Sequence, residues 1–191
     1  VDGTLSDISF SASGDSAAVL GTPDSPSNIA INENGTWIAV TEYNNEFFAN
    51  HPPASMEKFT LERAGLGIES RVMLPPDFDP TQKYPMILEI HGGPFANYGW
   101  RFSAEVQMYA AAGYVVLYVN PRGSTSYGQK YVEEIHHAYP GKDYDDLMSA
   151  VDSVVDRGFV DPAQLYVTGG SGGGILTAWV VGKTGRFRAA V

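Results

Sequence analysis

The sequence contains no cysteine and no long apolar segment. Without cysteine, disulfide bonds, thiolate catalysis and cysteine-ligated zinc are excluded, although the cellular compartment stays open. No apolar run approaches the roughly 20 residues that a membrane-spanning helix requires, so we expect no membrane partner. Histidine is scarce as well, with only four copies among 191 residues.

Basic residues are also few. There are 12 Lys and Arg against 22 Asp and Glu, which gives a formal net charge of −10. This balance argues against nucleic acid as a partner, and the acidic residues are spread along the chain as on a solubilising surface. Hydrophobic residues make up 43% of the chain and aromatic residues 12%, which is typical of a globular domain and not of a disordered one.

Residues 1–50 are predicted to form β structure. Short apolar runs flank Ser13-Gly14-Asp15 and again Glu33-Asn34-Gly35, and Asn-Gly between alternating apolar runs is a strong hairpin signal. Two hairpins suit one blade of a β-propeller, which 50 residues cannot close alone. The sequence begins Val1-Asp2-Gly3, without Met or a signal-like segment, and we therefore expect its start to be processed or cut.

Residues 51–191 are predicted to form an α/β domain. An antiparallel pair is expected at 59–63 and 69–74. After it, strands expected at 86–90, 114–119 and 165–168 alternate with helices at 103–112, at 143–156 and from Ile175 onward. Such alternation predicts a parallel sheet covered by helices on both faces.

A glycine-rich stretch surrounds one serine, in Thr168-Gly169-Gly170-Ser171-Gly172-Gly173-Gly174. A flexible linker has similar composition, but here a predicted strand precedes the stretch and a predicted apolar helix follows it. Strand, Gly-x-Ser-x-Gly and helix form the context of a nucleophile elbow. We therefore predict Ser171 as the catalytic nucleophile, with Gly169 and Gly173 letting neighbouring backbone pass without Cβ clashes.

A catalytic serine that transfers acyl groups also needs an oxyanion hole. The N–H of Gly172, at the start of the predicted helix, is one expected donor. The segment His91-Gly92-Gly93-Pro94 follows the strand at 86–90, where the second donor of an α/β-hydrolase lies. We favour Gly93 over Gly92 for this role, against the alternative that the segment is only a turn.

The base and acid of a catalytic triad are not found where the order Ser…Asp/Glu…His places them. The 20 residues after Ser171 contain no His, Asp or Glu, and all four histidines precede Ser171. His136 and His137 are adjacent, so on a helix they point in different directions and make a poor metal site. We expect them on the solvated surface, and we expect no metal and no cofactor.

Three acidic residues open the helix predicted at 143–156, namely Asp143, Asp145 and Asp146. We expect them to supply negative charge to its first turn, where the helix dipole favours it.

The chain resembles the prolyl oligopeptidase family of serine peptidases, in its acylaminoacyl-peptidase and dipeptidyl-peptidase-like branch. The matching segments, within residues 59–191, are Lys83-Tyr84-Pro85, Ile90-His91-Gly92-Gly93-Pro94, Asn120-Pro121-Arg122-Gly123-Ser124 with Tyr127-Gly128, Asp143-Tyr144-Asp145-Asp146-Leu147, residues 168–174 and Phe187-Arg188-Ala189-Ala190-Val191. The resemblance implies cleavage of short peptides by Ser171, with Gly93 and Gly172 lining the oxyanion hole. Many relatives carry Tyr or Asn where this chain has Gly172, so a side-chain contact to substrate is lost while the N–H remains.

The resemblance also implies parts beyond this sequence. In that family a β-propeller precedes an α/β-hydrolase domain, and the triad Asp and His lie well downstream of the serine. We therefore interpret residues 1–50 as the last propeller blade and residues 51–191 as the N-terminal portion of the hydrolase domain, truncated after the elbow helix. The expected partners are a short peptide substrate, the C-terminal part of the hydrolase domain and the rest of the propeller; the chain alone is expected to be inactive.

Two alternatives stay open. A carboxylesterase or lipase shares the elbow and the oxyanion hole, and a non-catalytic module could keep the α/β-hydrolase fold to bind a ligand or a partner. The sequence does not distinguish acylaminoacyl, dipeptidyl and endopeptidase specificity, and it leaves the oligomeric state open.

Overall fold

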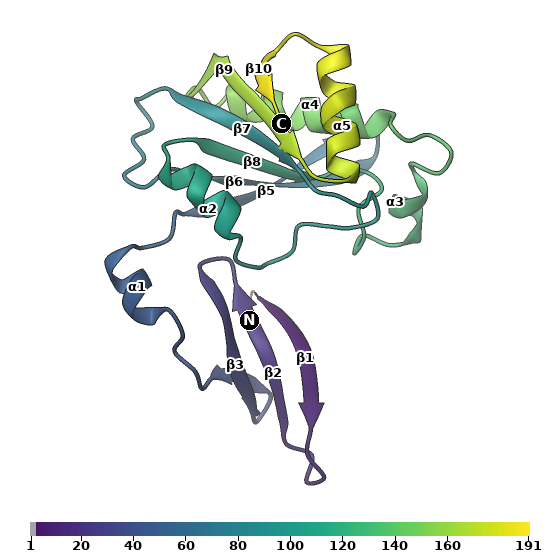
Figure 1. The fold of residues 1–191 in the computed structure, drawn as a ribbon. Coiled ribbons are helices and arrows are strands. Elements are labelled where there is room, and N and C mark those ends of the chain that lie inside the picture. Colours follow the sequence, from purple (N-terminus) through teal and green to yellow (C-terminus); the bar gives the residue numbers. More distant parts are fainter. Residues whose placement is uncertain (1–2) are drawn as a thin grey trace. The chain divides into compact units, whose positions relative to one another are not determined.

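The computed structural model describes residues 3–191, which divide into two compact units (Figure 1). One unit comprises the chain up to Ala54 together with Gly99–Gln107, and the other comprises Ser55–Tyr98 and Met108–Val191. The expectation about Val1 and Asp2 lies outside the described residues. Among the residues described, no helix is both long and apolar enough to cross a bilayer.

The first unit is built on a four-stranded antiparallel sheet. Its strands follow chain order: β1 (Thr4–Phe10), β2 (Ser16–Thr22), β3 (Ser25–Glu33) and β4 (Thr36–Ala39). Asn34 and Gly35 both have positive φ, at 53° and 85°, as a two-residue hairpin turn requires. The predicted Asn-Gly hairpin is therefore confirmed. The short helix α1 (Asn45–Asn50) follows and was not predicted.

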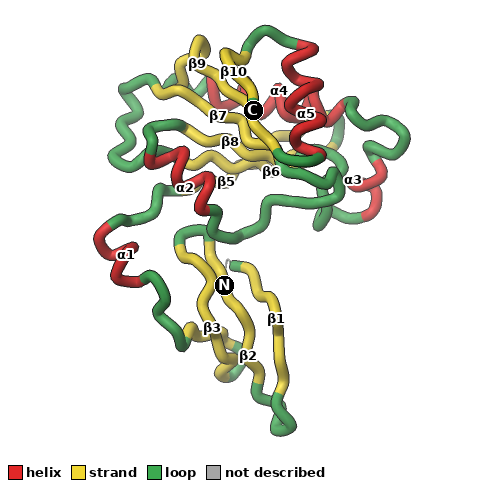
Figure 2. The backbone as a smooth tube through the Cα atoms, viewed as in Figure 1, coloured by secondary structure: helices red, strands yellow, loops and turns green. Residues whose placement is uncertain are grey.

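The second unit is built on a six-stranded sheet with the order β10-β9-β7-β8-β6-β5 (Figure 2). Its strands are β5 (Met56–Arg63), β6 (Leu66–Met73), β7 (Tyr84–Ile90), β8 (Val115–Asn120), β9 (Val160–Gly169) and β10 (Phe187–Ala190). Strands β7 to β10 pair in parallel, whereas β6 is antiparallel to both β5 and β8. The predicted antiparallel pair and the predicted parallel sheet are both confirmed. Every residue of β8 is buried, which explains its continuous apolar run.

The helices are α2 (Ala104–Ala111), α3 (Gln129–Glu133), α4 (Lys142–Val155) and α5 (Gly172–Lys183). Helices α4 and α5 contact each other and pack on the sheet (Figure 1). Leu147, Val151 and Val154 of α4 are fully buried in this core, as their common stripe predicted. Helix α3 has only five residues, too few for an apolar periodicity, and the sequence did not reveal it.

Candidate active site

Strand register brings two distant segments of the sequence together. Ile90, the last residue of β7, is paired with Gly169, the last residue of β9, and the two strands are parallel. Strand β8 is also parallel to β7, so its carboxyl end faces the same edge of the sheet. The segments that follow the three strands therefore meet at one edge, where ligands of open α/β sheets bind.

Ser171 occupies the turn between β9 and α5 in an unusual backbone conformation. Its φ of 56° and ψ of −118° are rare for a residue with a side chain, and such strain is concentrated at functional sites. A serine before a helix normally caps the first turn with its hydroxyl, but Ser171 makes no such capping hydrogen bond. The side chain is exposed, so the hydroxyl is available for chemistry.

The elbow packs directly on the end of β7 because two of its residues lack a side chain. A Cβ on Gly173 would lie 2.0 Å from the carbonyl oxygen of Ile90, and one on Gly169 would lie 2.6 Å from the same oxygen. Neither distance is possible for a real side chain. The structure therefore confirms that Gly169 and Gly173 allow neighbouring backbone to pass.

The segment after β7 lies against the elbow. A Cβ on Gly172 would meet the backbone N and O of Gly93 at 3.1 Å, and one on Gly92 would lie 3.4 Å from the Cβ of Ser171. Gly93 has a φ of +120°, which a side chain rarely tolerates. Among the backbone hydrogen bonds of turns, loops and helix caps within residues 3–191, none is donated by the N–H of Gly93 or by that of Gly172. Both donors proposed from the sequence thus lie beside Ser171.

His91 is hydrogen-bonded to residues of the segments that follow β7 and β8. Its Nε2 lies 3.0 Å from the hydroxyl oxygen of Ser124, and its Nδ1 lies 2.7 Å from the carbonyl oxygen of Gly92. The hydroxyl of Ser124 in turn donates to the carbonyl oxygen of Pro121 at 2.7 Å. These bonds tie the segment after β7 to the segment after β8.

The other histidines do not form a site. His136 and His137 are exposed, as predicted, with ring centroids 3.9 Å apart, and His51 belongs to the other unit. In the described part of the chain, no cluster of three or more His, Asp or Glu side chains is suited to hold a metal ion.

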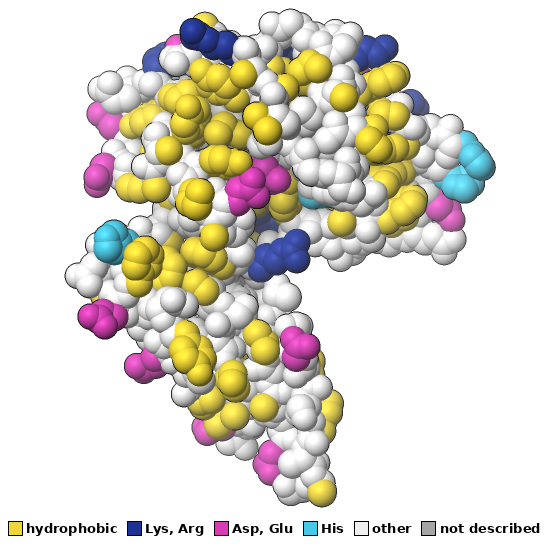
Figure 3. Space-filling model, viewed as in Figure 1, with side chains coloured by type: hydrophobic (Ala, Val, Ile, Leu, Met, Phe, Trp, Pro, Cys, Tyr) yellow, Lys and Arg dark blue, Asp and Glu magenta, His cyan; other side chains and the backbone are white. Residues whose placement is uncertain are grey.

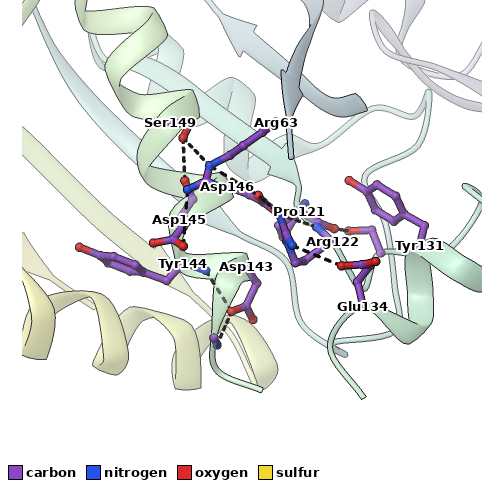
Figure 4. A network of polar contacts seen from close by, with 12 residues as sticks. Arg63, Pro121, Arg122, Tyr131, Glu134, Asp143, Tyr144, Asp145, Asp146 and Ser149 are labelled. Carbon is purple, nitrogen blue, oxygen red and sulfur yellow. Dashed lines mark hydrogen bonds and ion pairs between the residues drawn. The ribbon is translucent and has the colours of Figure 1, made fainter. Parts of the chain in front are cut away.

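A buried ion pair fixes the segment after β8 to helix α4 (Figure 4). The Nε of Arg122 donates to Asp146 at 2.8 Å, and both side chains are buried. The hydrogen bond that the Arg122 side chain donates to Asp146 is the main reason why the pKa of Arg122 is raised. The expectation that Asp146 supplies charge to the first turn of the helix is therefore wrong, because its carboxylate faces Arg122.

Arg63, the last residue of β5, also contacts helix α4 close to this ion pair. Its Nη2 lies 3.5 Å from Asp145, and its Nε donates to the hydroxyl of Ser149 at 2.8 Å (Figure 4). Sequence reasoning assigned no role to Arg122 or Ser124. The signal was present in Asn120-Pro121-Arg122-Gly123-Ser124 after a buried strand, but the partners of these residues lie in other elements.

Asp143 is buried in the first turn of α4, as its position in the sequence suggested. Its Oδ1 accepts hydrogen bonds from the N–H groups of Gly141 at 2.5 Å and Tyr144 at 3.0 Å. Burial nevertheless raises the pKa of this carboxyl, because the charged form has lost its hydration.

These features define the class. The protein is a mixed α/β protein with an exposed serine on a tight turn between a parallel strand and a helix.

Comparisons with known proteins agree. Residues 100–191 match the model of the prolyl oligopeptidase family. The chain is 41% identical over 189 residues to "Uncharacterized peptidase YuxL" of Bacillus subtilis, covering 96% of this chain and 29% of that protein. It is 34% identical over 161 residues to dipeptidyl-peptidase 5 of Porphyromonas gingivalis, covering 83% and 24%. The acylaminoacyl peptidase of Pyrococcus horikoshii has the same fold, with a TM-score of 0.92 at 23% identity, over 100% of this chain and 31% of that one.

The chain belongs to the prolyl oligopeptidase family, as the resemblance implied. It spans less than a third of the length of these relatives.

Proposed function

We propose that the protein is a serine peptidase that hydrolyses short peptides through an acyl-enzyme on Ser171. The observation that carries this proposal is the strained, exposed turn of Ser171 beside the N–H groups of Gly93 and Gly172. The Ser171 oxygen attacks the peptide carbonyl, and the two N–H groups stabilise the resulting oxyanion. The amine then leaves, and water releases the acyl group from Ser171.

Attack by a serine hydroxyl requires a base that takes its proton. Among the described histidines, His91 lies next to the site, but both of its ring nitrogens face Gly92 and Ser124. We therefore propose that the triad Asp and His are supplied from outside these 191 residues. In this view the six-stranded unit is the N-terminal portion of an α/β-hydrolase domain.

We propose further that the four-stranded unit is one blade of a β-propeller. One face of its sheet carries Ile29, Ile38 and Val40, with 45%, 43% and 52% of their surface exposed, and Figure 3 shows apolar side chains on the visible face of this unit. Propeller blades are four-stranded sheets packed side by side around a channel. Neighbouring blades would cover this apolar face.

The substrate class follows from the family. The relatives named above carry the names peptidase, dipeptidyl-peptidase and acylaminoacyl peptidase, which favours short peptides over esters. A carboxylesterase would use the same elbow, and comparing hydrolysis of an amide and an ester of one acyl group separates the two functions.

The test replaces Ser171 by Ala in the full-length protein and measures hydrolysis of blocked aminoacyl chromogenic substrates. We expect activity to fall to the residual level that binding and the oxyanion hole sustain, roughly 1000- to 10,000-fold over water. Ser153→Ala is the matched control, because its hydroxyl bonds only to the carbonyl of Ala150 on α4. Activity of Ser171→Ala within about tenfold of wild type would place the nucleophile elsewhere.

A further inference from the structure

One side chain from outside the elbow holds the residue that follows the serine. The hydroxyl of Tyr139, in the segment between α3 and α4, donates a hydrogen bond of 2.6 Å to the carbonyl oxygen of Gly172. Gly172 also carries one of the two N–H groups assigned to the oxyanion. Tyr139 therefore contacts the site through the backbone of the elbow.

Such a contact can hold the elbow in place, because most residues of the elbow are glycines. Residues without Cβ have wide backbone freedom and lose the most entropy when they are fixed. Gly169 and Gly173 are confined by their packing on Ile90. Gly172, the first residue of α5, has no side chain of its own to hold it, and a Cβ built on it would lie 3.0–3.1 Å from the backbone of Gly93.

The Tyr139 side chain is itself held in place by the residues around it. It is half-buried and packs against the hydrophobic core. The nearby Asp143 fixes the following turn by accepting the N–H of Gly141 at 2.5 Å. Burial first, and then the charge of Asp143, raise the pKa of the Tyr139 hydroxyl, so it keeps its proton and remains a donor.

We propose that Tyr139 is a positioning residue of the oxyanion hole. Its hydroxyl holds the peptide bond between Gly172 and Gly173. This restrains the backbone of Gly172 and thereby sets the direction of the Gly172 N–H relative to that of Gly93. This inference rests on the proposed function of Ser171. Because the negative charge on the oxygen develops only in the transition state, misdirection of the donor lowers kcat more than it changes substrate binding.

The experiment compares variants of the full-length protein. Tyr139→Phe removes only the hydroxyl, and Tyr84→Phe is the matched control. The Tyr84 hydroxyl accepts the N–H of Asp79 at 2.9 Å, and Tyr84 begins β7, at the opposite end of the strand from His91. Four quantities are measured: kcat and KM for a chromogenic peptide, Ki for the corresponding peptide aldehyde, and Kd of the peptide for the Ser171→Ala form with and without Tyr139→Phe. The aldehyde forms a tetrahedral adduct with Ser171 and so reports on the oxyanion hole.

For Tyr139→Phe we expect kcat to fall roughly tenfold, the factor that one hydrogen bond typically contributes, and the aldehyde Ki to rise by the same factor. KM and the peptide Kd should stay within about twofold, as should every parameter of Tyr84→Phe. Unchanged kcat and Ki would overturn the inference, as would a rise in KM and Kd alone or an equal loss in Tyr84→Phe. If Ser171→Ala keeps its activity, the proposed function itself fails and takes this inference with it.

Discussion

The carboxylate of Asp146 accepts three hydrogen bonds from Arg122, one from the backbone N–H at 3.0 Å and two from the guanidinium at 2.8 and 2.9 Å. The pair joins the segment after β8 to helix α4, with both side chains buried. The same segment contains Ser124, which bonds His91 beside the elbow. The relative placement of the segments around Ser171 therefore depends in part on this ion pair.

Replacing Asp146 by Asn should strongly destabilise the protein. The buried guanidinium of Arg122 would lose its buried counter-charge and keep only the exposed carboxylate of Glu134, which lies 3.3 Å from its Nη1; loss of one partner of a buried pair typically costs about 3–5 kcal/mol. Asp152→Asn on the same helix is the control, because Asp152 pairs with Arg186 at 2.7 Å while it is largely exposed. An exposed pair contributes about 0–1 kcal/mol. Denaturant unfolding measures the free energy of unfolding of both variants. An equal loss of stability in the two would contradict the conclusion that the buried pair of Arg122 and Asp146 stabilises the fold.

Gly172→Ala should lower kcat without unfolding the protein. The new Cβ would lie 3.0–3.1 Å from the backbone of Gly93, so the two donors must shift apart by a few tenths of an ångström; we expect a smaller loss of kcat than the roughly 100-fold that a misplacement of about 1 Å costs. Gly182→Ala in the same helix is the control, since nothing lies within 4 Å of its Cβ. Steady-state kinetics on both variants measure the effect; a Gly172→Ala enzyme with wild-type kcat would show that the backbone of Gly93 accommodates a Cβ at position 172 without disturbing the two donors. Gly93→Pro is not informative, because a φ of +120° is closed to proline.

Asp143→Asn should stabilise the protein at neutral pH and lose this advantage as the pH falls. Burial raises the folded-state pKa of Asp143, so the folded protein binds the proton more tightly than the unfolded chain does. Above the folded pKa the buried charge therefore destabilises the fold, and below it the wild-type carboxyl is neutral, like the amide. Melting temperatures of both forms are compared from about pH 8 down to about pH 4, close to the ordinary pKa of an Asp side chain. If the difference in melting temperature between the two forms did not depend on pH, it would contradict the conclusion that burial raises the pKa of Asp143.

Residues 1–191, prepared as a separate polypeptide, should react poorly with a fluorophosphonate probe. In the proposed function the base that activates Ser171 lies outside this segment, and a neutral serine hydroxyl is a weak nucleophile. Addition of the downstream part of the hydrolase domain should restore labelling. Strong labelling of the separate segment at Ser171 would show that a histidine within it completes the site, and His91 would be the first to mutate.

The sequence by itself determined the elements and their local chemistry. Apolar periodicity located β7, β8 and α4 within a few residues, because burial on one face or on both leaves its own pattern. Asn34-Gly35 predicted its hairpin turn, and the glycines at positions 169 and 173 predicted the close passage of the elbow over β7. These signals are local: each depends on residues close in sequence, and the backbone has few ways to satisfy them.

Only the tertiary structure decided which distant groups meet. The strand order places β7 between β8 and β9, which brings Gly93 to Gly172. The three acidic residues of α4 look alike in sequence, yet successive positions on a helix point in different directions, so the buried Asp146 meets Arg122 and Arg63 while the more exposed Asp145 contacts Arg63. The bond from Tyr139 to Gly172 likewise spans 33 positions. Such pairings depend on strand register and on the course of the intervening loops, neither of which is encoded near the residues that meet.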